Sequence, residues 1–323
     1  MYETFYALRE RPFDLTPNPR FLLLTGKHRE AISNLQYGLT SRRGLTLLLG
    51  EAGTGKTTVV RAILDEFAGR GAKIAYLNNP TLTRDEFYEV LAAAFDLPAD
   101  AGASKVRLLA HLERALTQRY ADGVLTALVI DEVQAMPEDL LEEVRLLANI
   151  ETATTKLLPI VLSGQPELAD RLNRPSLRQL KQRVALRCDL APLDARETAE
   201  YIAGRLRIAG GNCALVFTRQ AVDVVYQHSK GIPRLISVIC DNALISGFAA
   251  DRRPVDREIV VEVCRDFDLI ARGDQAPAPA ETPAQRPRPD HKAEPEPEAK
   301  AKPEPHHKGL FEHFSVRRRF SLF

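Results

Sequence analysis

Eight consecutive residues, Gly50 to Thr57, have the types and spacing of a loop that binds phosphate groups. They read Gly-Glu-Ala-Gly-Thr-Gly-Lys-Thr and fit the pattern G-x-x-x-x-G-K-[ST]. Glycines let the backbone turn so that its N–H groups point at phosphate oxygens, and the amino end of a following helix adds positive charge. In this pattern Lys56 reaches the β- and γ-phosphates and Thr57 is a Mg²⁺ ligand. The expected phosphate-binding residues are Gly50, Glu51, Ala52, Gly53, Thr54, Gly55, Lys56, Thr57 and Thr58.

An acidic pair, Asp131 and Glu132, ends a second apolar run about 70 residues further along the chain. In an open parallel sheet, ligands bind at the carboxyl ends of the strands. Asp131 is expected to hold the Mg²⁺ hydration shell, and Glu132 to take a proton from the attacking water. A strand that ends in two acids is a weak signal alone, but it becomes a strong one downstream of a phosphate-binding loop.

Three further polar groups are candidates for the same site. Ser163 and Gln165 follow an apolar run and could orient the lytic water. Arg234 opens a helix after Gly231, with Pro233 at a first-turn position. Between them lies a basic segment in which an arginine could reach a neighbouring subunit's γ-phosphate; its members are Arg174, Arg178, Lys181, Arg183 and Arg187.

Short apolar runs alternate with amphipathic helical patterns up to residue 193. The predicted strands are 45–49, 73–78, 126–131, 157–163 and 184–190, and the predicted helices between them are 57–68, 84–95, 106–120 and 138–149. This alternation predicts an α/β fold with a parallel sheet flanked by helices. The remaining patterns predict a small all-helical domain over 194–272, with helices at 195–209, 218–229, 233–249 and 256–269.

The last 51 residues differ in composition from the rest of the chain. Residues 273–308 contain nine prolines and no large aliphatic or aromatic side chain, so they cannot bury a core and are expected to act as a disordered spacer. Residues 309–323, GLFEHFSVRRRFSLF, place aromatic residues around an arginine triplet. We expect this segment to dock on a protein partner or an anionic membrane surface.

Charge and cysteine content exclude several classes of protein. The formal net charge is +1, so a nucleic-acid partner is not expected. No apolar run is long enough to span a bilayer, and the amino terminus lacks a secretory signal; we expect a cytoplasmic protein, with peripheral contact to the inner membrane as a further expectation. The four cysteines form no CxxC pair and are expected to be buried and reduced.

With these residues in place, the chain resembles the AAA+ ATPases of the general secretion pathway protein A family. The relatives in mind include the ATPase of mannose-sensitive pilus biogenesis and the secretion ATPases beside exosortase or exopolysaccharide genes. The resemblance covers about residues 1–269, and it rests on the phosphate-binding loop, the acidic pair and the following segments: FYALRERPFDLTPNPRFL, the segment 28–44, VRLLANIET, SGQPEL, LRQLKQRV and GIPRLI.

The resemblance implies a P-loop NTPase domain over 1–193 with the helical segment 194–272 as its lid. It implies that Ser163 or Gln165 is sensor 1, Arg183 the arginine finger and Arg234 sensor 2, with Arg178 and Arg187 as alternatives to Arg183. The region of Pro12, Phe13 and Pro17 is expected to cover the adenine. The family's secretion members continue into a transmembrane helix and a peptidoglycan-binding domain that this sequence lacks, which favours the shorter, exosortase-locus type.

The leading hypothesis is a Mg²⁺-dependent ATPase that forms a ring, expected to be hexameric, and organises a membrane-associated secretion, polysaccharide export or pilus assembly machine. A DNA-handling ATPase of the transposition type, similar to TniB, shares the core motifs, but the near-zero charge and the lack of a clustered basic face disfavour it. A nucleotide-gated switch with little turnover is a third hypothesis, disfavoured by the presence of Glu132.

Overall fold

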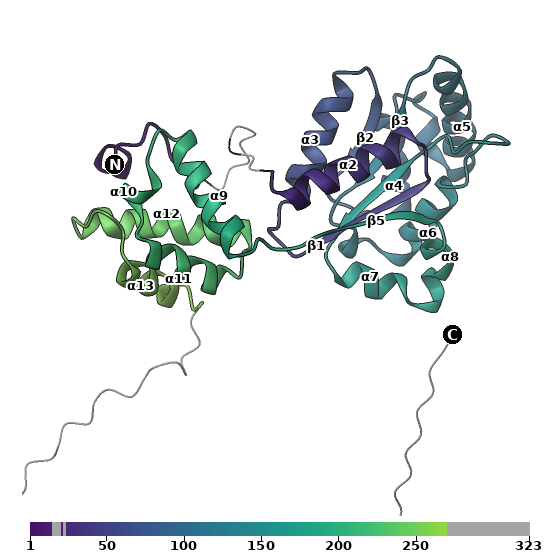
Figure 1. Cartoon of the computed structure of the whole chain (residues 1–323). Helices are drawn as coiled ribbons and strands as arrows, with labels where there is room; N and C mark the ends of the chain where they lie inside the picture. The colour runs from purple at the N-terminus through teal and green to yellow at the C-terminus, as the bar shows by residue number, and fades with distance from the viewer. Residues whose placement is uncertain (15–20, 22–23, 270–323) are drawn as a thin grey trace, which may run out of the picture. The chain divides into compact units, whose positions relative to one another are not determined.

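The computed structural model describes residues 1–14, 21 and 24–269, which all belong to one compact unit. The expected spacer 273–308 and docking segment 309–323 lie outside the described residues. Figure 1 shows the described elements in chain order.

A five-stranded parallel sheet forms the centre of the larger part of this unit. Its order is β2-β3-β4-β1-β5. The strands are β1 (Leu45–Gly50), β2 (Lys73–Leu77), β3 (Thr126–Ile130), β4 (Ile160–Gly164) and β5 (Val184–Leu190). Because the chain passes from β1 to β2 and returns to place β4 beside β1, the carboxyl ends of β1, β3 and β4 lie together at one edge of the sheet.

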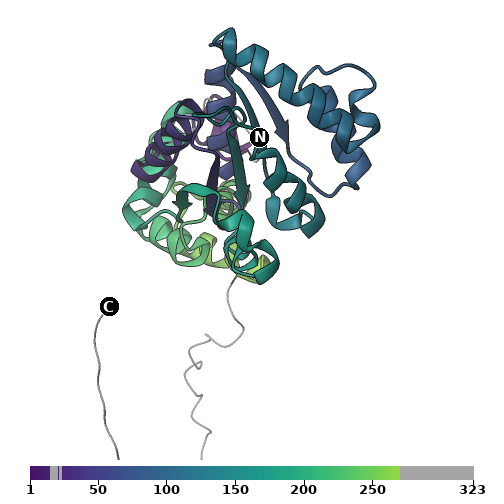
Figure 2. The ribbon, with the colours of Figure 1, turned by 90° about the vertical axis from the view of Figure 1, so that its right-hand side faces the viewer.

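Helices cover both faces of the sheet because alternate strand residues point to opposite sides. On one face Leu48, Val129 and Val161 pack against α2 (Gly26–Thr40) and α3 (Lys56–Ala68). On the other face Leu47 and Ile130 pack against α4 (Arg84–Ala94), α5 (Lys105–Ala121) and α6 (Glu138–Leu147). In Figure 2 the purple helix α2 and the blue-teal helix α5 lie on opposite sides of the strands.

Short helices connect the sheet strands near their ends. They are η2 (Ala101–Ala103), η3 (Val133–Ala135), α7 (Glu167–Leu172), η4 (Pro175–Leu177) and α8 (Arg178–Lys181). Of these, η3 follows β3 directly, and α7 follows β4 after two residues. Both therefore lie where the chain leaves the carboxyl edge of the sheet.

After β5 the described chain is helical and forms a second hydrophobic core. Its helices are α9 (Ala195–Ile208), α10 (Cys213–Val216), α11 (Arg219–Ser229), α12 (Pro233–Ala249) and α13 (Arg257–Asp266). Gly231 lies between α11 and α12, where its backbone oxygen accepts a hydrogen bond from the Leu193 N–H at 2.9 Å. A Cβ on Gly231 would lie 1.8 Å from the Leu193 oxygen, and its φ is 74°, so only glycine fits there.

The amino-terminal segment packs on these helices and not on the sheet to which its order in the sequence assigned it. Tyr2, Tyr6 and Phe13 are buried in the helical core, after and within the short helix α1 (Tyr2–Phe5). The Tyr2 hydroxyl donates to Asp241 Oδ1 of α12 at 2.5 Å, and Phe13 packs edge-on against Phe217. The helical part is thus built from two stretches of chain that are far apart in sequence.

The predicted fold class is confirmed: the structure is a parallel sheet with flanking helices, followed by helices alone. β4 begins at Ile160, three residues later than predicted, because Pro159 has no N–H to donate to the ladder. Helix α2 was not predicted. Cys188, Cys240 and Cys264 are buried free thiols, while Cys213 is only partly buried. Over the described ranges, no helix is long and apolar enough to cross a membrane.

Candidate nucleotide site

The predicted phosphate-binding loop connects the carboxyl end of β1 to the first turn of α3. β1 is buried along its whole length, which fixes where the loop begins. Helix α3 begins at Lys56, and its N-cap Gly55 has a left-handed φ of 101°. Its first turn contains no acidic residue, so the unpaired N–H groups and the positive end of the helix dipole face the loop without a competing side-chain charge.

The side chain of Lys56 is held by the loop itself. Its Nζ donates to the backbone oxygens of Gly50 at 2.8 Å and Glu51 at 3.0 Å. Only 4% of the residue is exposed, and this burial lowers the pKa of Lys56, although nearby Glu132 and Asp131 act in the opposite direction. A buried ammonium group without a carboxylate at bonding distance provides strong attraction for a phosphate oxygen.

Thr57 and Asp131 meet at the junction of α3 and β3. The Thr57 hydroxyl donates to Asp131 Oδ2 at 2.7 Å, and Asp131 is 2% exposed. A hydroxyl and a carboxylate are oxygen ligands of the kind that Mg²⁺ prefers. The two oxygen donors therefore fit a Mg²⁺ ion, as the sequence predicted.

Glu132 is oriented by its backbone and by Gln134. Its φ of 54° is left-handed, and its N–H donates to Asp131 Oδ1 at 3.0 Å. Gln134 Nε2 donates a short hydrogen bond to the Glu132 carboxylate. A positive φ is uncommon for glutamate, and this conformation lets neighbouring Asp131 and Glu132 take different roles at one strand end.

Gln134 also connects Glu132 to the segment after β4, a contact that sequence reasoning missed. Its Oε1 accepts the Gln165 N–H at 3.0 Å. Arg171 of α7 supports the same turn by donating to the backbone oxygens of Gln134 at 2.6 Å and Met136 at 2.8 Å. A glutamine two residues beyond an acidic pair gives no sequence signal of this bridge, because Gln165 is 31 residues away.

Ser163 lies within β4 and is fully buried. Its Oγ has no hydrogen-bond partner in the described part of the protein. A buried hydroxyl of this kind needs an explanation, and a bound water or ligand is one. Gln165 contributes its backbone N–H to the site, so of the two expected sensor residues, each has a different contact to offer.

Arg234 comes to the loop from the helical part of the unit. Its N–H donates to the backbone oxygen of Gly53 at 3.3 Å, and a Cβ on Gly53 would lie 2.8 Å from the Arg234 Cβ. The Arg234 side chain is exposed at the start of α12. The predicted loop, acidic pair and Arg234 thus lie in one neighbourhood, although 184 and 103 residues separate Arg234 from Gly50 and Asp131.

Comparison with known proteins agrees with this geometry. Residues 39–172 match a family model described as an AAA domain. The chain is 42% identical over 250 residues to general secretion pathway protein A of Aeromonas hydrophila, an alignment that covers 77% of this chain and 45% of that protein. The chain belongs to the AAA+ ATPase family.

Solved structures show the same fold at low sequence identity. Cdc6p of Pyrobaculum aerophilum is 17% identical with a TM-score of 0.61, over 79% of this chain and 70% of that one. ORC2 of Aeropyrum pernix is 18% identical with a TM-score of 0.58, over 80% and 71%. These likenesses concern the AAA+ fold alone. The chain spans less than half the length of general secretion pathway protein A.

Within this AAA+ chain, Arg183 lies at the opposite edge of the sheet from the loop. β5 pairs with β1 in parallel, with Val184 opposite Leu45 and Leu190 opposite Gly50. Five residue steps along a strand correspond to about 17 Å, which is longer than an arginine side chain. Arg183 therefore cannot reach a phosphate bound at its own chain's loop.

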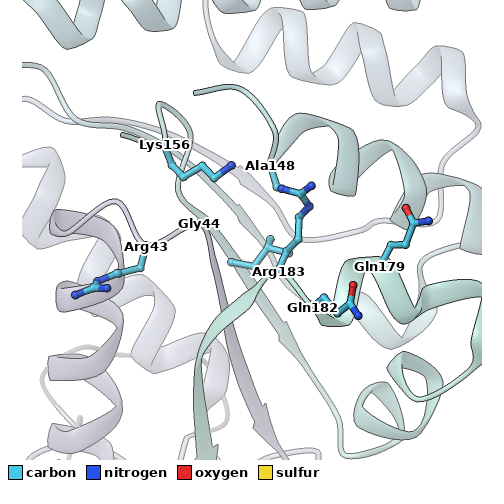
Figure 3. A pocket seen from close by; sticks show the side chains of 8 residues that line it. Arg43, Gly44, Ala148, Lys156, Gln179, Gln182 and Arg183 are labelled. Atoms are coloured by element: carbon cyan, nitrogen blue, oxygen red, sulfur yellow. The ribbon is translucent and has the colours of Figure 1, made fainter. Parts of the chain in front are cut away.

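Arg183 lines a cavity of about 520 Å³ at this amino edge. Figure 3 shows the charged ends of Lys156 and Arg183 directed toward each other, while Arg43 points away from them. Lys156 is paired with Glu151, and Arg43 donates to the Tyr37 hydroxyl at 2.9 Å. The lining residues are Arg43, Gly44, Leu45, Ala148, Lys156, Gln179, Gln182 and Arg183.

The other basic residues of this segment differ in whether they are already paired. Arg187 forms an ion pair with Asp189 at 2.9 Å, and Arg174 forms one with Glu138 at 3.0 Å. Within the described ranges, neither Arg178 nor Arg183 forms an ion pair with an acidic side chain. Arg183 and Arg178 are thus the arginines of this segment whose charge is available to a neighbour.

Proposed function

We propose that this AAA+ protein hydrolyses ATP in a Mg²⁺-dependent reaction. The observation that carries the proposal is the convergence of Lys56, Thr57, Asp131 and Glu132 at the carboxyl edge of the sheet. The Thr57–Asp131 hydrogen bond of 2.7 Å joins the end of the phosphate-binding loop to the acidic strand end. A phosphate cradle beside a carboxylate base is the arrangement that phosphoryl transfer to water requires.

In this reaction each residue has a separate task. Lys56 neutralises charge on the β- and γ-phosphates, and Arg234 approaches from the helical part to cover them. Glu132 accepts the proton of the attacking water while Gln134 holds the carboxylate in direction. Ser163 and Gln165 orient that water. Thr57 and Asp131 hold the Mg²⁺, which neutralises charge developing on the phosphate oxygens.

We infer further that the active form is a ring of copies of this chain. Arg183 is too far from its own loop to assist there, and no described acid pairs with it. In a head-to-tail ring, the amino edge of one sheet can face the nucleotide of the next subunit. An arginine placed in this way stabilises the charge of the transition state.

The machine that this ATPase serves is proposed from its relative. The alignment to general secretion pathway protein A covers residues that include the whole candidate site, which supports a role beside membrane-associated secretion, polysaccharide export or pilus assembly proteins. The cytoplasmic side of the membrane is the place where ATP is available to such a machine. Docking there is proposed through residues 309–323.

Replacing Lys56 with alanine tests nucleotide binding. The Lys56→Ala protein should bind ATP at least about tenfold more weakly, because it loses charge-assisted hydrogen bonds of about 1.5–3 kcal/mol each. Calorimetric titration with ATP and Mg²⁺ measures the change, and Lys181→Ala, an exposed lysine on α8, is the matched control. Wild-type protein that binds no ATP and releases no phosphate from it would refute the proposed activity altogether.

Removing residues 309–323 tests docking separately from catalysis. ATP hydrolysis in solution should stay within about twofold of the full chain, since the loss of contacts with lipid or partner, about 1 kcal/mol for each of the three arginines near an anionic surface, affects only membrane attachment. Fractionation of cells should show the protein moving from the membrane pellet to the supernatant. The same distribution for both chains would show that this segment does not dock the protein.

A further inference from the structure

A buried histidine, His28, contacts the backbone of the phosphate-binding loop. It stands in the first turn of α2, whose N-cap is Thr25, and only 5% of it is exposed. His28 Nε2 lies 3.2 Å from the backbone oxygen of Thr54, and Nδ1 lies 2.8 Å from Thr25 Oγ1. Both ring nitrogens therefore have a partner, and one of these partners is part of the loop.

The two contacts define which nitrogen of His28 carries the proton. A carbonyl oxygen can only accept, so Nε2 must carry the hydrogen and donate it to the Thr54 oxygen. Nδ1 of the neutral ring then accepts from the Thr25 hydroxyl. Burial lowers the pKa of His28, with Glu197 and the Thr54 contact acting in the opposite direction, and a neutral ring agrees with this pattern of donors and acceptors.

Holding the Thr54 oxygen fixes the direction of the next N–H group. The peptide bond is planar and trans, so the Thr54 C=O and the Gly55 N–H point in opposite directions. With the oxygen turned toward His28, the Gly55 N–H is turned away from α2. Backbone N–H groups of a loop with this sequence are the groups that surround the α- and β-phosphates.

Gly55 is confined on the same side by the histidine ring. A Cβ on Gly55 would lie 3.1 Å from His28 Nε2, and the φ of Gly55 is 101°. The next residue, Lys56, already belongs to α3. The Thr54–Gly55 peptide is therefore positioned from one side by His28 and from the other by the start of α3.

We propose that His28 is a positioning residue of the nucleotide site, which orients the Thr54–Gly55 peptide so that the Gly55 N–H donates to a phosphate oxygen. This inference rests on the proposed binding of ATP. It adds a residue from α2, an element outside the loop and the acidic strand end. Since the affected N–H belongs to the part of the loop that surrounds the inner phosphates, ATP and ADP should depend on His28 to a similar degree.

The matched variants His28→Gln and His28→Asn test the proposal. The glutamine amide nitrogen can reach the place of Nε2 and donate to Thr54, whereas the shorter asparagine reaches only the place of Nδ1. Calorimetric titration with ADP and with a non-hydrolysable ATP analogue should show His28→Asn binding both about tenfold more weakly, or about 1.4 kcal/mol. His28→Gln should stay within about threefold of wild type.

Steady-state kinetics separates positioning from a general loss of structure. For His28→Asn we expect the KM for ATP to rise about tenfold while kcat at saturating ATP stays within about twofold, because Glu132 and Asp131 are not in contact with His28. Circular dichroism first verifies that each variant is folded. If His28→Asn does not fold, His28→Ala replaces it and the same limits apply.

Two results would overturn the role of His28. The first is unchanged affinity of the folded variant that lacks the Nε2 donor. The second is an equal loss in His28→Gln and His28→Asn, which would mean that the hydrogen bond to Thr54 is not the cause. Failure of the wild-type chain to bind either nucleotide would instead contradict the proposed function, so the two failures are distinguishable.

Discussion

Protein carrying Glu132→Gln is expected to bind ATP with nearly unchanged affinity and to hydrolyse it at least about 100-fold more slowly. This is the scale of a lost general base. The amide has the shape of the carboxylate and can still accept the hydrogen bond from Gln134, so the backbone at the end of β3 should keep its conformation. Only the ability to take a proton from water is removed.

Phosphate release under saturating ATP and Mg²⁺ measures the rate, and titration with ATP measures the affinity. Glu113→Gln, an exposed glutamate on α5, is a matched control that should retain full turnover. If Glu132→Gln turns over ATP as fast as wild type, Glu132 is not the base. Loss of ATP binding in the same variant would instead show that the carboxylate supports the loop.

Replacing Arg183 with alanine is expected to lower the rate of hydrolysis by about three orders of magnitude without weakening ATP binding in the same chain. The lower end of the range for an arginine finger is about 10³-fold. Binding should be preserved because Arg183 lies at the amino edge of the sheet, about 17 Å along the strands from the loop. Arg174→Ala, which removes a paired arginine, is the control.

Mixing two inactive variants tests whether Arg183 acts across a subunit boundary. A chain with Glu132→Gln still supplies Arg183 to a neighbour, and a chain with Arg183→Ala still has an intact base. In randomly mixed head-to-tail rings at equal amounts, about a quarter of all sites should be complete. No recovery in rings shown to contain both chains would contradict the role in trans, and Arg178 would then be tested in the same way.

Sequence patterns predicted the sheet well because each strand is a short apolar run between turn residues. β1, β2, β3 and β5 lie within one residue of their predicted bounds. The run 157–163 misled at its start, because Leu157 and Leu158 are buried but precede the ladder. An apolar run reports burial, whereas a strand also requires backbone pairing.

Helix α2 was missed because its buried stripe is not apolar throughout. Its buried positions include His28 and Gly38 beside Ala31, Leu35 and Leu39. A histidine and a glycine lower the apparent amphipathicity, although both face the interior. Each is buried for a specific contact: a Cβ on Gly38 would collide with Thr46 of β1 at 2.3 Å.

The candidate site divides in the same way between what local patterns specify and what folding brings together. The phosphate-binding loop and Asp131–Glu132 are local patterns next to predicted strands, so their positions followed from the sequence. The contacts of Gln134 with Gln165 and of His28 with Thr54 join side chains to backbone atoms far along the chain. No spacing rule relates such partners, and only the packed elements reveal them.

The way the amino-terminal segment joins the helical core sets a timetable for synthesis of the protein. Tyr2 and its hydrogen-bond partner Asp241 are 239 residues apart. At about 5–20 residues per second, a ribosome needs roughly 10–50 s to make the intervening chain. Throughout that interval Tyr2, Tyr6 and Phe13 have no core to enter, although the residues of the sheet can already assemble. A nascent chain stalled before α12 would thus present an aromatic amino terminus to chaperones and proteases.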